Sequence, residues 1–146
     1  MHTRRHFMTI VLGITLSTAL HAGQLQRDVA SGTGKFQSVS KTDPAWQKSI
    51  DAHELTAAAK LIGQAASFKG TVSKVYESRD GDIVILDFDA NYRTALTAVL
   101  KKPDFGKFPD LRDLSGKEII VSGSFVDYQG KAEIVLTSPD QIKLVK

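Results

Sequence analysis

Cysteine is absent from the 146 residues of this sequence, which also holds only four histidines and one tryptophan. Without cysteine the chain forms no disulfide, so its folded stability comes from packing and hydrogen bonding alone. Zinc and other transition-metal sites need clustered Cys or His ligands, and the sequence has no such cluster. We therefore expect neither a metal nor another cofactor.

Long hydrophobic runs are equally scarce. The apolar run at residues 10–20 follows the Arg4–Arg5 pair and is too short to span a bilayer as a permanent helix. We interpret residues 1–22 as a secretory signal peptide cleaved after Ala19 or Ala22, which predicts a periplasmic or secreted protein without a stable membrane span after cleavage. A twin-arginine signal and an ordinary secretory signal fit the basic start equally well.

The excess of positive charge is small. The whole chain has 19 Lys and Arg against 16 Asp and Glu, and loss of two arginines with the signal leaves 17 minus 16, or +1. From residue 64 onward, 12 basic residues stand against 12 acidic ones. The folded part therefore has no net basic field to attract phosphate backbones, which weakens any interpretation based on charge-driven nucleic-acid binding.

Two regions follow the signal. Residues 23–48 are rich in Gly, Ser, Thr, Gln and Lys and predict a flexible lead, in which Trp46 is a partial anchor on the domain. Residues 49–146 predict one domain that begins with a helix over residues 50–63. Asp51 is expected to cap this helix and Gly63 to end it in the left-handed conformation.

Period-two alternation predicts the strands of this domain. Three consecutive strands are expected over residues 64–76, 82–88 and 93–100, the first with a bulge or bend near Gly70 to Ser73. Residues 114–145 predict a hairpin with one apolar face, made of Ile119, Val121, Gly123 and Phe125 and then, after a turn at Gln129 and Gly130, of Ile134 and Leu136.

Residues 101–115 interrupt the strand rhythm with two prolines, while Phe105, Phe108, Leu111 and Leu114 recur at roughly helical spacing. A short helix is therefore expected between the third and fourth strands. The predicted fold class is mainly β: a five-stranded OB-type Greek-key barrel with a preceding N-terminal helix.

Four segments carry a resemblance to a known family: Gly70 to Val75, Ile85 to Phe88, Leu114 to Lys117, and Pro139 to Ile142. Together they resemble a small bacterial OB-fold domain that is appended to thermonuclease-like proteins and is also found as a free-standing exported module. The family commonly has Arg where this chain has Ser122, and an Arg there would hold a phosphate or a carboxylate.

The sequence predicts no enzymatic activity. Nucleophilic catalysis needs a base beside a nucleophile, and His53 is the single histidine after the predicted signal. Asp87, Asp89 and Asn91 match the opening of a calcium loop, but Tyr92 and Ala98 stand where that loop needs Gly and Glu. We interpret this segment as a turn with acidic caps.

Binding is the favoured function. The ligand face of an OB fold is built by its second and third strands and by two of its loops, which makes aromatic and cationic residues there the candidates. These ligand-binding candidates are Tyr76, Arg79, Tyr92, Arg93, Tyr128 and Lys131. Two functions stay open: a non-catalytic module for single-stranded nucleic acid or another extended polymer such as a glycan, and an interaction module for another envelope protein. In the second case Tyr92 and Tyr128 only cover the barrel ends.

Overall fold

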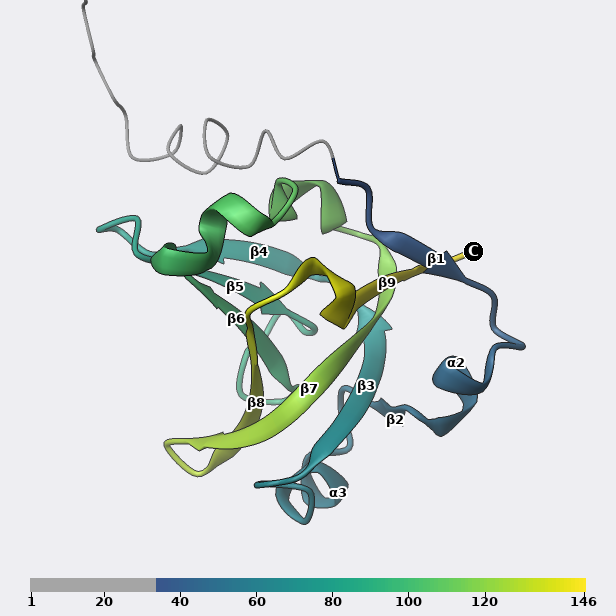
Figure 1. Cartoon of the computed structure of the whole chain (residues 1–146). Helices are drawn as coiled ribbons and strands as arrows, with labels where there is room; N and C mark the ends of the chain where they lie inside the picture. The colour runs from purple at the N-terminus through teal and green to yellow at the C-terminus, as the bar shows by residue number, and fades with distance from the viewer. Residues whose placement is uncertain (1–33) are drawn as a thin grey trace, which may run out of the picture.

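The computed structural model describes residues 34–146, so the predicted signal peptide and the first part of the lead lie outside the described residues. The described chain is mainly β and curls into a barrel-like sheet (Figure 1). Its strands are β1 (Gln37–Val39), β2 (Ile50–Asp51), β3 (Ala65–Thr71), β4 (Lys74–Glu77), β5 (Ile83–Asp87), β6 (Thr97–Lys101), β7 (Glu118–Tyr128), β8 (Lys131–Leu136) and β9 (Ile142–Val145). Its helices are α2 (Pro44–Lys48), α3 (Leu55–Ala59) and the 3₁₀ helices η1 (Lys102–Lys107), η2 (Leu111–Leu114) and η3 (Pro139–Gln141).

The strand order is that of an OB-type Greek key. Hydrogen-bonded neighbours run β4-β5-β6-β8-β7-β3, with β6 and β8 parallel and the other pairs of this series antiparallel. Strands β3 and β4 are two halves of one bent segment. The Val72 amide donates to the carbonyl oxygen of Lys117, next to β7, whereas the Ser73 amide donates to the carbonyl oxygen of Asp87 on β5, so the chain changes its partner strand between these two residues. The predicted bend near Gly70 to Ser73 is therefore confirmed.

The prediction of five strands is too low. The five expected strands are present, but the bend divides the first into β3 and β4, and three short strands, β1, β2 and β9, extend the sheet. Short strands of two to four residues have too few positions for a period-two pattern to emerge from the sequence.

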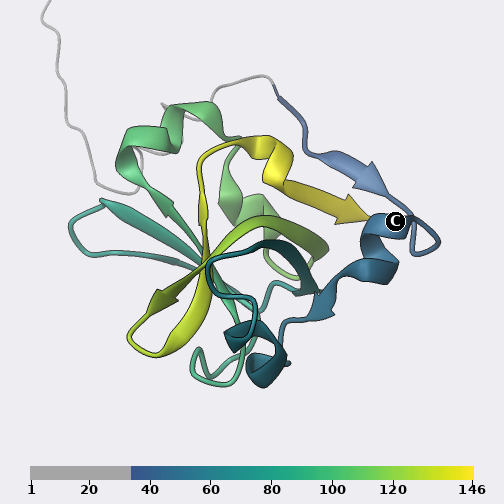
Figure 2. The same cartoon turned by 60° about the horizontal axis from the view of Figure 1, so that its bottom comes forward.

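Helical turns close both ends of the barrel. The 3₁₀ helices η1 and η2 lie across one end and bury the four apolar residues predicted there, Phe105, Phe108, Leu111 and Leu114. Helix α3 lies at the opposite end (Figures 1 and 2). No helix within residues 34–146 is long and apolar enough to cross a membrane.

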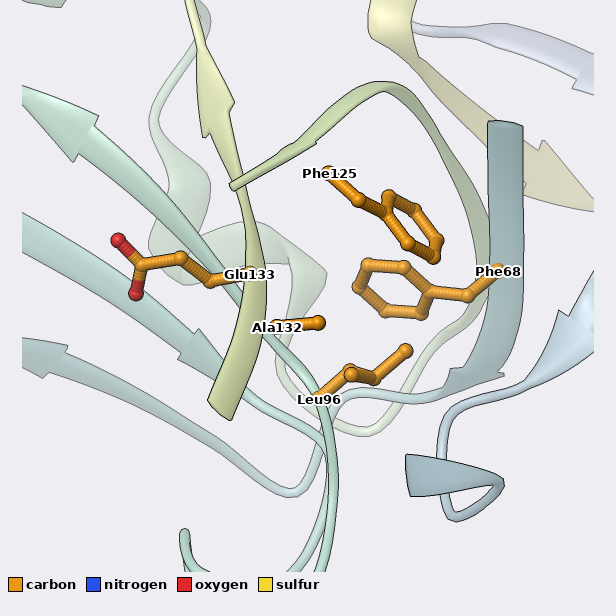
Figure 3. Close-up of a pocket in the computed structure, with 5 residues that line it drawn as sticks. All are labelled: Phe68, Leu96, Phe125, Ala132 and Glu133. Carbon is orange, nitrogen blue, oxygen red and sulfur yellow. The ribbon is translucent and has the colours of Figure 1, made fainter. Parts of the chain in front are cut away.

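The core lies between these ends and is filled by aromatic and branched side chains. Phe68 is fully buried on β3, with its ring edge-on to Phe88 at 4.9 Å and to Phe125 at 6.2 Å between centroids. Figure 3 shows Phe68, Phe125, Leu96 and the methyl group of Ala132 converging from four segments of the chain. The space between them has no room for a water molecule.

The helix predicted over residues 50–63 is wrong in its first half. Ile50 and Asp51 form strand β2, which pairs in parallel with Phe68 and Lys69, and the helix covers only Leu55–Ala59. Asp51 does not cap it: its carboxylate accepts the His53 amide, 2.9 Å away. Strand pairing outweighs the local capping signal here because it is reinforced by the burial of the following residue, Ala52.

Residues 34–48 depart from the predicted flexible lead, because they hold β1 and α2. Strand β1 pairs in parallel with β9, and Asp43 caps α2 by accepting the Ala45 amide at 2.8 Å. Trp46 is the partial anchor that the sequence predicts: it is half-buried, and the Lys69 ammonium lies 4.6 Å from its ring centroid.

The predicted hairpin of β7 and β8 is confirmed. Gln129 and Gly130 both have positive φ, 53° and 83°, as a tight two-residue turn between these strands requires. Ile119, Val121 and Phe125 face the core together with Ile134 and Leu136. Gly123 has a φ of 156°, and an added Cβ would lie 2.7 Å from the side-chain nitrogen Nε2 of Gln141. Only glycine therefore fits this position without strain.

Candidate functional site

An open groove of about 820 Å³ runs along the outer face of the barrel between the β4–β5 sheet, the loop from β5 to β6, and the turn from β7 to β8. Figure 2 shows the β4–β5 hairpin and the β7–β8 hairpin spreading apart from the centre of the barrel, with the β5–β6 loop beside the β7–β8 turn. Helix α3 adds Leu55 and Ala59 at one end. Five of the six predicted ligand-binding residues line this groove, namely Tyr76, Tyr92, Arg93, Tyr128 and Lys131.

The floor of the groove has a polar row and an apolar flank. Register places Lys74 opposite Asp87, Asp87 opposite Thr97, and Thr97 opposite Glu133. One polar row therefore runs from the exposed Lys74 at the rim, on the edge strand β4, across the floor to Glu133. Tyr76 lies two residues after Lys74 on β4, and its partner Ile85 lies two residues before Asp87 on β5. Because side chains two positions apart on a strand share a face, this pair lies beside the polar row on the same face of the sheet. A planar ligand on this floor therefore meets hydrogen-bonding groups on one edge and apolar surface beside them.

Three tyrosines rise around the floor. Tyr92 on the β5–β6 loop is 54% exposed, Tyr128 at the end of β7 is 56% exposed, and Tyr76 on β4 is 42% exposed. Large aromatic side chains left this open on one face are available for contact with a ligand. They come from three separate segments, so only the folded barrel brings them together.

Cations accompany two of these rings. The Arg93 guanidinium lies 5.4 Å from the Tyr92 centroid, and its Nε donates a hydrogen bond to the Tyr92 hydroxyl at 3.1 Å. The Lys74 ammonium lies 5.6 Å from the Tyr76 centroid. Both cations sit at exposed positions on the rim, where they are available to an anionic group of a ligand whose planar part contacts the rings.

Lys131 has a structural role that the sequence does not predict, in addition to its place in the groove. Its ammonium donates hydrogen bonds to the carbonyl oxygens of Tyr92 and Ala95, at 2.5 and 3.0 Å. These bonds hold the β5–β6 loop against the start of β8 and fix the base of the Tyr92 ring. Lys131 is therefore a positioning residue for the loop as well as a charge in the groove.

Arg79 does not line the groove. It lies exposed in the turn between β4 and β5, a tight turn in which the Ser78 hydroxyl accepts the amides of Asp82 and Ile83. The turn itself is where the sequence predicts it, but Arg79 is not among the side chains that line the groove.

Burial perturbs the charged groups of the floor. It raises the pKa of Asp87 and of Glu133, against the opposing pull of Lys131 on both carboxylates. Burial likewise lowers the pKa of the Lys131 ammonium, against the attraction of Asp87 and Glu133. Each ion is thus partly desolvated, and the floor holds two acids and one base at close quarters.

The β5–β6 loop forms the turn with acidic caps that the sequence predicts. The Asp89 carboxylate accepts the Asn91 amide at 2.9 Å, and the Asn91 side chain accepts the Arg93 amide at 3.1 Å. These oxygens serve the turn itself, and no group of metal-binding side chains is found within residues 34–146.

His53 connects this loop to the segment before α3. Its Nδ1 lies 2.9 Å from the Asp51 carboxylate and its Nε2 lies 3.0 Å from the Asp89 carboxylate. The hydrogen bonds to Asp51 and Asp89 raise the pKa of His53 above its ordinary value of 6.5. Protonated His53 therefore ties together two segments that flank the groove.

This contact predicts a pH-dependent contribution to stability. Because the pKa of His53 is higher in the folded state, the stabilisation is complete below pH 6.5 and is lost as the pH rises through the raised value. Relative to His53→Gln, the native protein should be more stable by about 0.5 kcal/mol at low pH, the scale of an exposed ion pair. Thermal unfolding of both proteins across this pH range measures the effect, and a difference that stays constant with pH contradicts it.

Besides the predicted candidates, the groove is lined by residues that the sequence does not predict as ligand-binding, among them Lys74, Ile85, Asp87 and Glu133. The available signal was the period-two pattern, since these side chains occupy the outward positions of strands whose inward positions are apolar. Glu133 stands between the buried Ala132 and Ile134, and Asp87 is predicted near the end of the strand over residues 82–88, where the turn with acidic caps begins.

Fold and groove together define an OB-like, mainly β domain with an open aromatic-lined face. No protein-family description matches the chain, and no curated protein matches its sequence. Among solved structures, it is similar to an aspartyl tRNA synthetase from Entamoeba histolytica, with a TM-score of 0.50 and 13% identity over 76% of this chain. The match spans 25% of that protein, so the chain is similar to about a quarter of it, and the likeness is one of fold.

Proposed function

We propose that this chain is a non-catalytic binding module for single-stranded nucleic acid, with the groove as its binding face. The observation that carries the proposal is the set of three exposed tyrosines around one groove, two of them with a cation beside the ring. Base stacking on such rings contributes about 1–3 kcal/mol per base and tolerates any sequence.

The location of the groove supports this proposal. OB folds bind oligonucleotides on the face of their second and third strands, between the loop that joins strands one and two and the loop that joins strands four and five. Here β5 and β6 are those strands and the β7–β8 turn is the second loop, whereas the β5–β6 loop takes the place of the first, the β4–β5 turn, which does not line the groove. The neighbour in fold is by name a tRNA synthetase, a class of enzyme that acts on a nucleic acid.

We also propose that the module works outside the cytoplasm, as the basic and apolar start of the sequence predicts. The absence of a catalytic role is argued from His53, the single histidine after the predicted signal. Both of its ring nitrogens contact carboxylates, which leaves neither to activate a hydroxyl nucleophile.

The test is a titration with fluorescent oligonucleotides of about ten nucleotides, matched to the site sizes of OB folds. We expect a dissociation constant on the order of 10 μM at low salt and weaker binding to the duplex of the same sequence, whose bases are not free to stack. Absence of binding to the single strand at tens of micromolar overturns the proposal.

The salt dependence of this binding should be shallow. Only Lys74 and Arg93 offer cations at the rim, because Lys131 is engaged with two carbonyl groups. Neutralisation of about two phosphates predicts a slope of about −1.4 in a plot of log affinity against log salt concentration. A slope of about −4 or steeper would mean that a cationic surface elsewhere, and not the groove, carries the binding.

A further inference from the structure

The two acids on the groove floor have acceptor atoms in reserve. Within residues 34–146, no backbone amide or side chain donates a hydrogen bond to the Asp87 carboxylate, and no ion pair is formed with it. Asp87 nevertheless is partly buried and faces the groove. A half-buried carboxylate with unused lone pairs is costly unless a donor reaches it, so the site favours a ligand that brings one.

Glu133 supplies a second acceptor in the same row. It is only 9% exposed, and Figure 3 shows its carboxylate on the opposite side of β8 from the side chains of Phe68, Phe125 and Ala132, away from the core. Its neighbour Thr97 offers one hydroxyl donor to a group that has room for several. Thus Asp87 and Glu133 flank Thr97 on the floor, and both have acceptor atoms available to a ligand.

Placement of the charges fixes how a strand would lie. The acids are on the floor, whereas Lys74 and Arg93 stand exposed at the rim. The floor carries two acids against the single Lys131 ammonium, which is bonded to two carbonyl oxygens, so phosphates favour the rim. The bases of a bound strand then point inward and present their edges to the carboxylates.

Carboxylates discriminate among bases by the donors on those edges. An exocyclic amino group, as on cytosine, adenine or guanine, donates to a carboxylate oxygen. Uracil and thymine instead present carbonyl oxygens on both sides of a single N–H, and these oxygens are repelled by a carboxylate. Selection against uracil and thymine follows where the base edge meets Asp87 and Glu133, because ionised carboxylates offer only acceptors.

We propose that Asp87 and Glu133 make the groove selective for bases that carry an exocyclic amino group, a selectivity that rests on the proposed function. Because few cations stand at its rim, the groove reads base edges more than phosphate charge. The ligand class is single-stranded nucleic acid rich in cytosine, adenine or guanine.

The experiment compares oligo(dC) with oligo(dU) of the same length, about ten nucleotides, at neutral pH. Cytosine has an amino group where uracil has a carbonyl oxygen, and its N3 lacks the hydrogen that uracil carries there. Ring size and backbone are otherwise matched. The native protein should bind oligo(dC) about ten-fold more tightly, the value of one hydrogen bond to a charged group.

Variants assign this selectivity to the floor. Asp87→Asn and Glu133→Gln each replace a pure acceptor by an amide that both donates and accepts, and they should reduce the ratio of the two affinities to about two-fold or less. Asp127→Asn, which removes the same charge from an exposed position of β7 outside the groove, should keep the ten-fold ratio.

The outcomes separate the two proposals. If neither oligonucleotide binds, the proposed function fails. If both bind the native protein with equal affinity, or if both floor variants keep the preference for oligo(dC), the selectivity of the floor is disproved and the proposed function stands. Circular dichroism establishes that each variant is folded, and the comparison on the native protein decides the question even if a variant is not.

Discussion

Replacement of Tyr92 and Tyr128 together by alanine should weaken binding of a single-stranded oligonucleotide by about 100-fold or more. Each ring offers a stacking surface, and loss of two stacked bases at about 1–3 kcal/mol each lowers the affinity by that factor. With a native dissociation constant on the order of 10 μM, the double variant should show no saturation in a fluorescence titration.

The matched control keeps both rings and removes only their hydroxyl groups. Tyr92→Phe with Tyr128→Phe retains the stacking surfaces but loses the hydrogen bond from Arg93 to the Tyr92 hydroxyl, so its affinity should fall by less than about ten-fold. Both tyrosines are more than half exposed, and neither double variant should change the melting temperature by more than a few degrees.

Two results would contradict this prediction. One is an alanine double variant that binds as tightly as the native protein, which would place the binding face elsewhere. The other is an equal loss in the alanine and phenylalanine variants, which would mean that the hydroxyl groups, and not the rings, make the contact. The first result would favour the alternative in which the tyrosines only cover the barrel ends.

Local signals in the sequence were sufficient for the hairpin of β7 and β8. Alternation of apolar residues fixed the face, and the Gln129–Gly130 pair fixed the turn, because few residues adopt positive φ at low cost. The bend between β3 and β4 was predictable for a similar reason, since Val75 breaks the alternation that Phe68 and Val72 establish.

Non-local pairing accounts for the errors. Residues 50–51 have good helix-start chemistry, yet they join β3 as a parallel strand, and only the folded position of Phe68 reveals this. Residues 37–39 look like linker but complete the edge beside β9. Short segments gain their structure from a partner far along the chain, and composition does not encode that partner.

The candidate site divides in the same way. Aromatic and cationic residues beside turns were visible in the sequence, and all but Arg79 line the groove. The polar row from Lys74 to Glu133 was not visible, because it is assembled by the register of four strands, two of them parallel. A role such as that of Lys131, whose ammonium holds the carbonyl groups of a loop 36 and 39 residues away, needs the folded chain to be seen.

Phe68→Ala should be the most destabilising single substitution in the core of the domain, at about 3–5 kcal/mol. Phe68 has no exposed surface, and its strand pairs with β2 on one side and β7 on the other. Its ring also contacts the edges of Phe88 and Phe125. Removal of the ring leaves a cavity at a point where the surrounding side chains leave no room for water, so that several elements lose contacts at once (Figure 3).

Urea unfolding measures this loss, with Phe68→Leu as the control that keeps a large apolar side chain and should cost about 1–2 kcal/mol. A domain of this size is stable by about 5–15 kcal/mol, so the alanine variant should remain folded at low temperature but unfold at a much lower urea concentration. Equal midpoints for the two variants would contradict the prediction. Strand β3, which carries Phe68, continues through the bend into β4, which carries Tyr76. The packing defect in Phe68→Ala should therefore also displace Tyr76 and weaken oligonucleotide binding, which the same fluorescence titration measures.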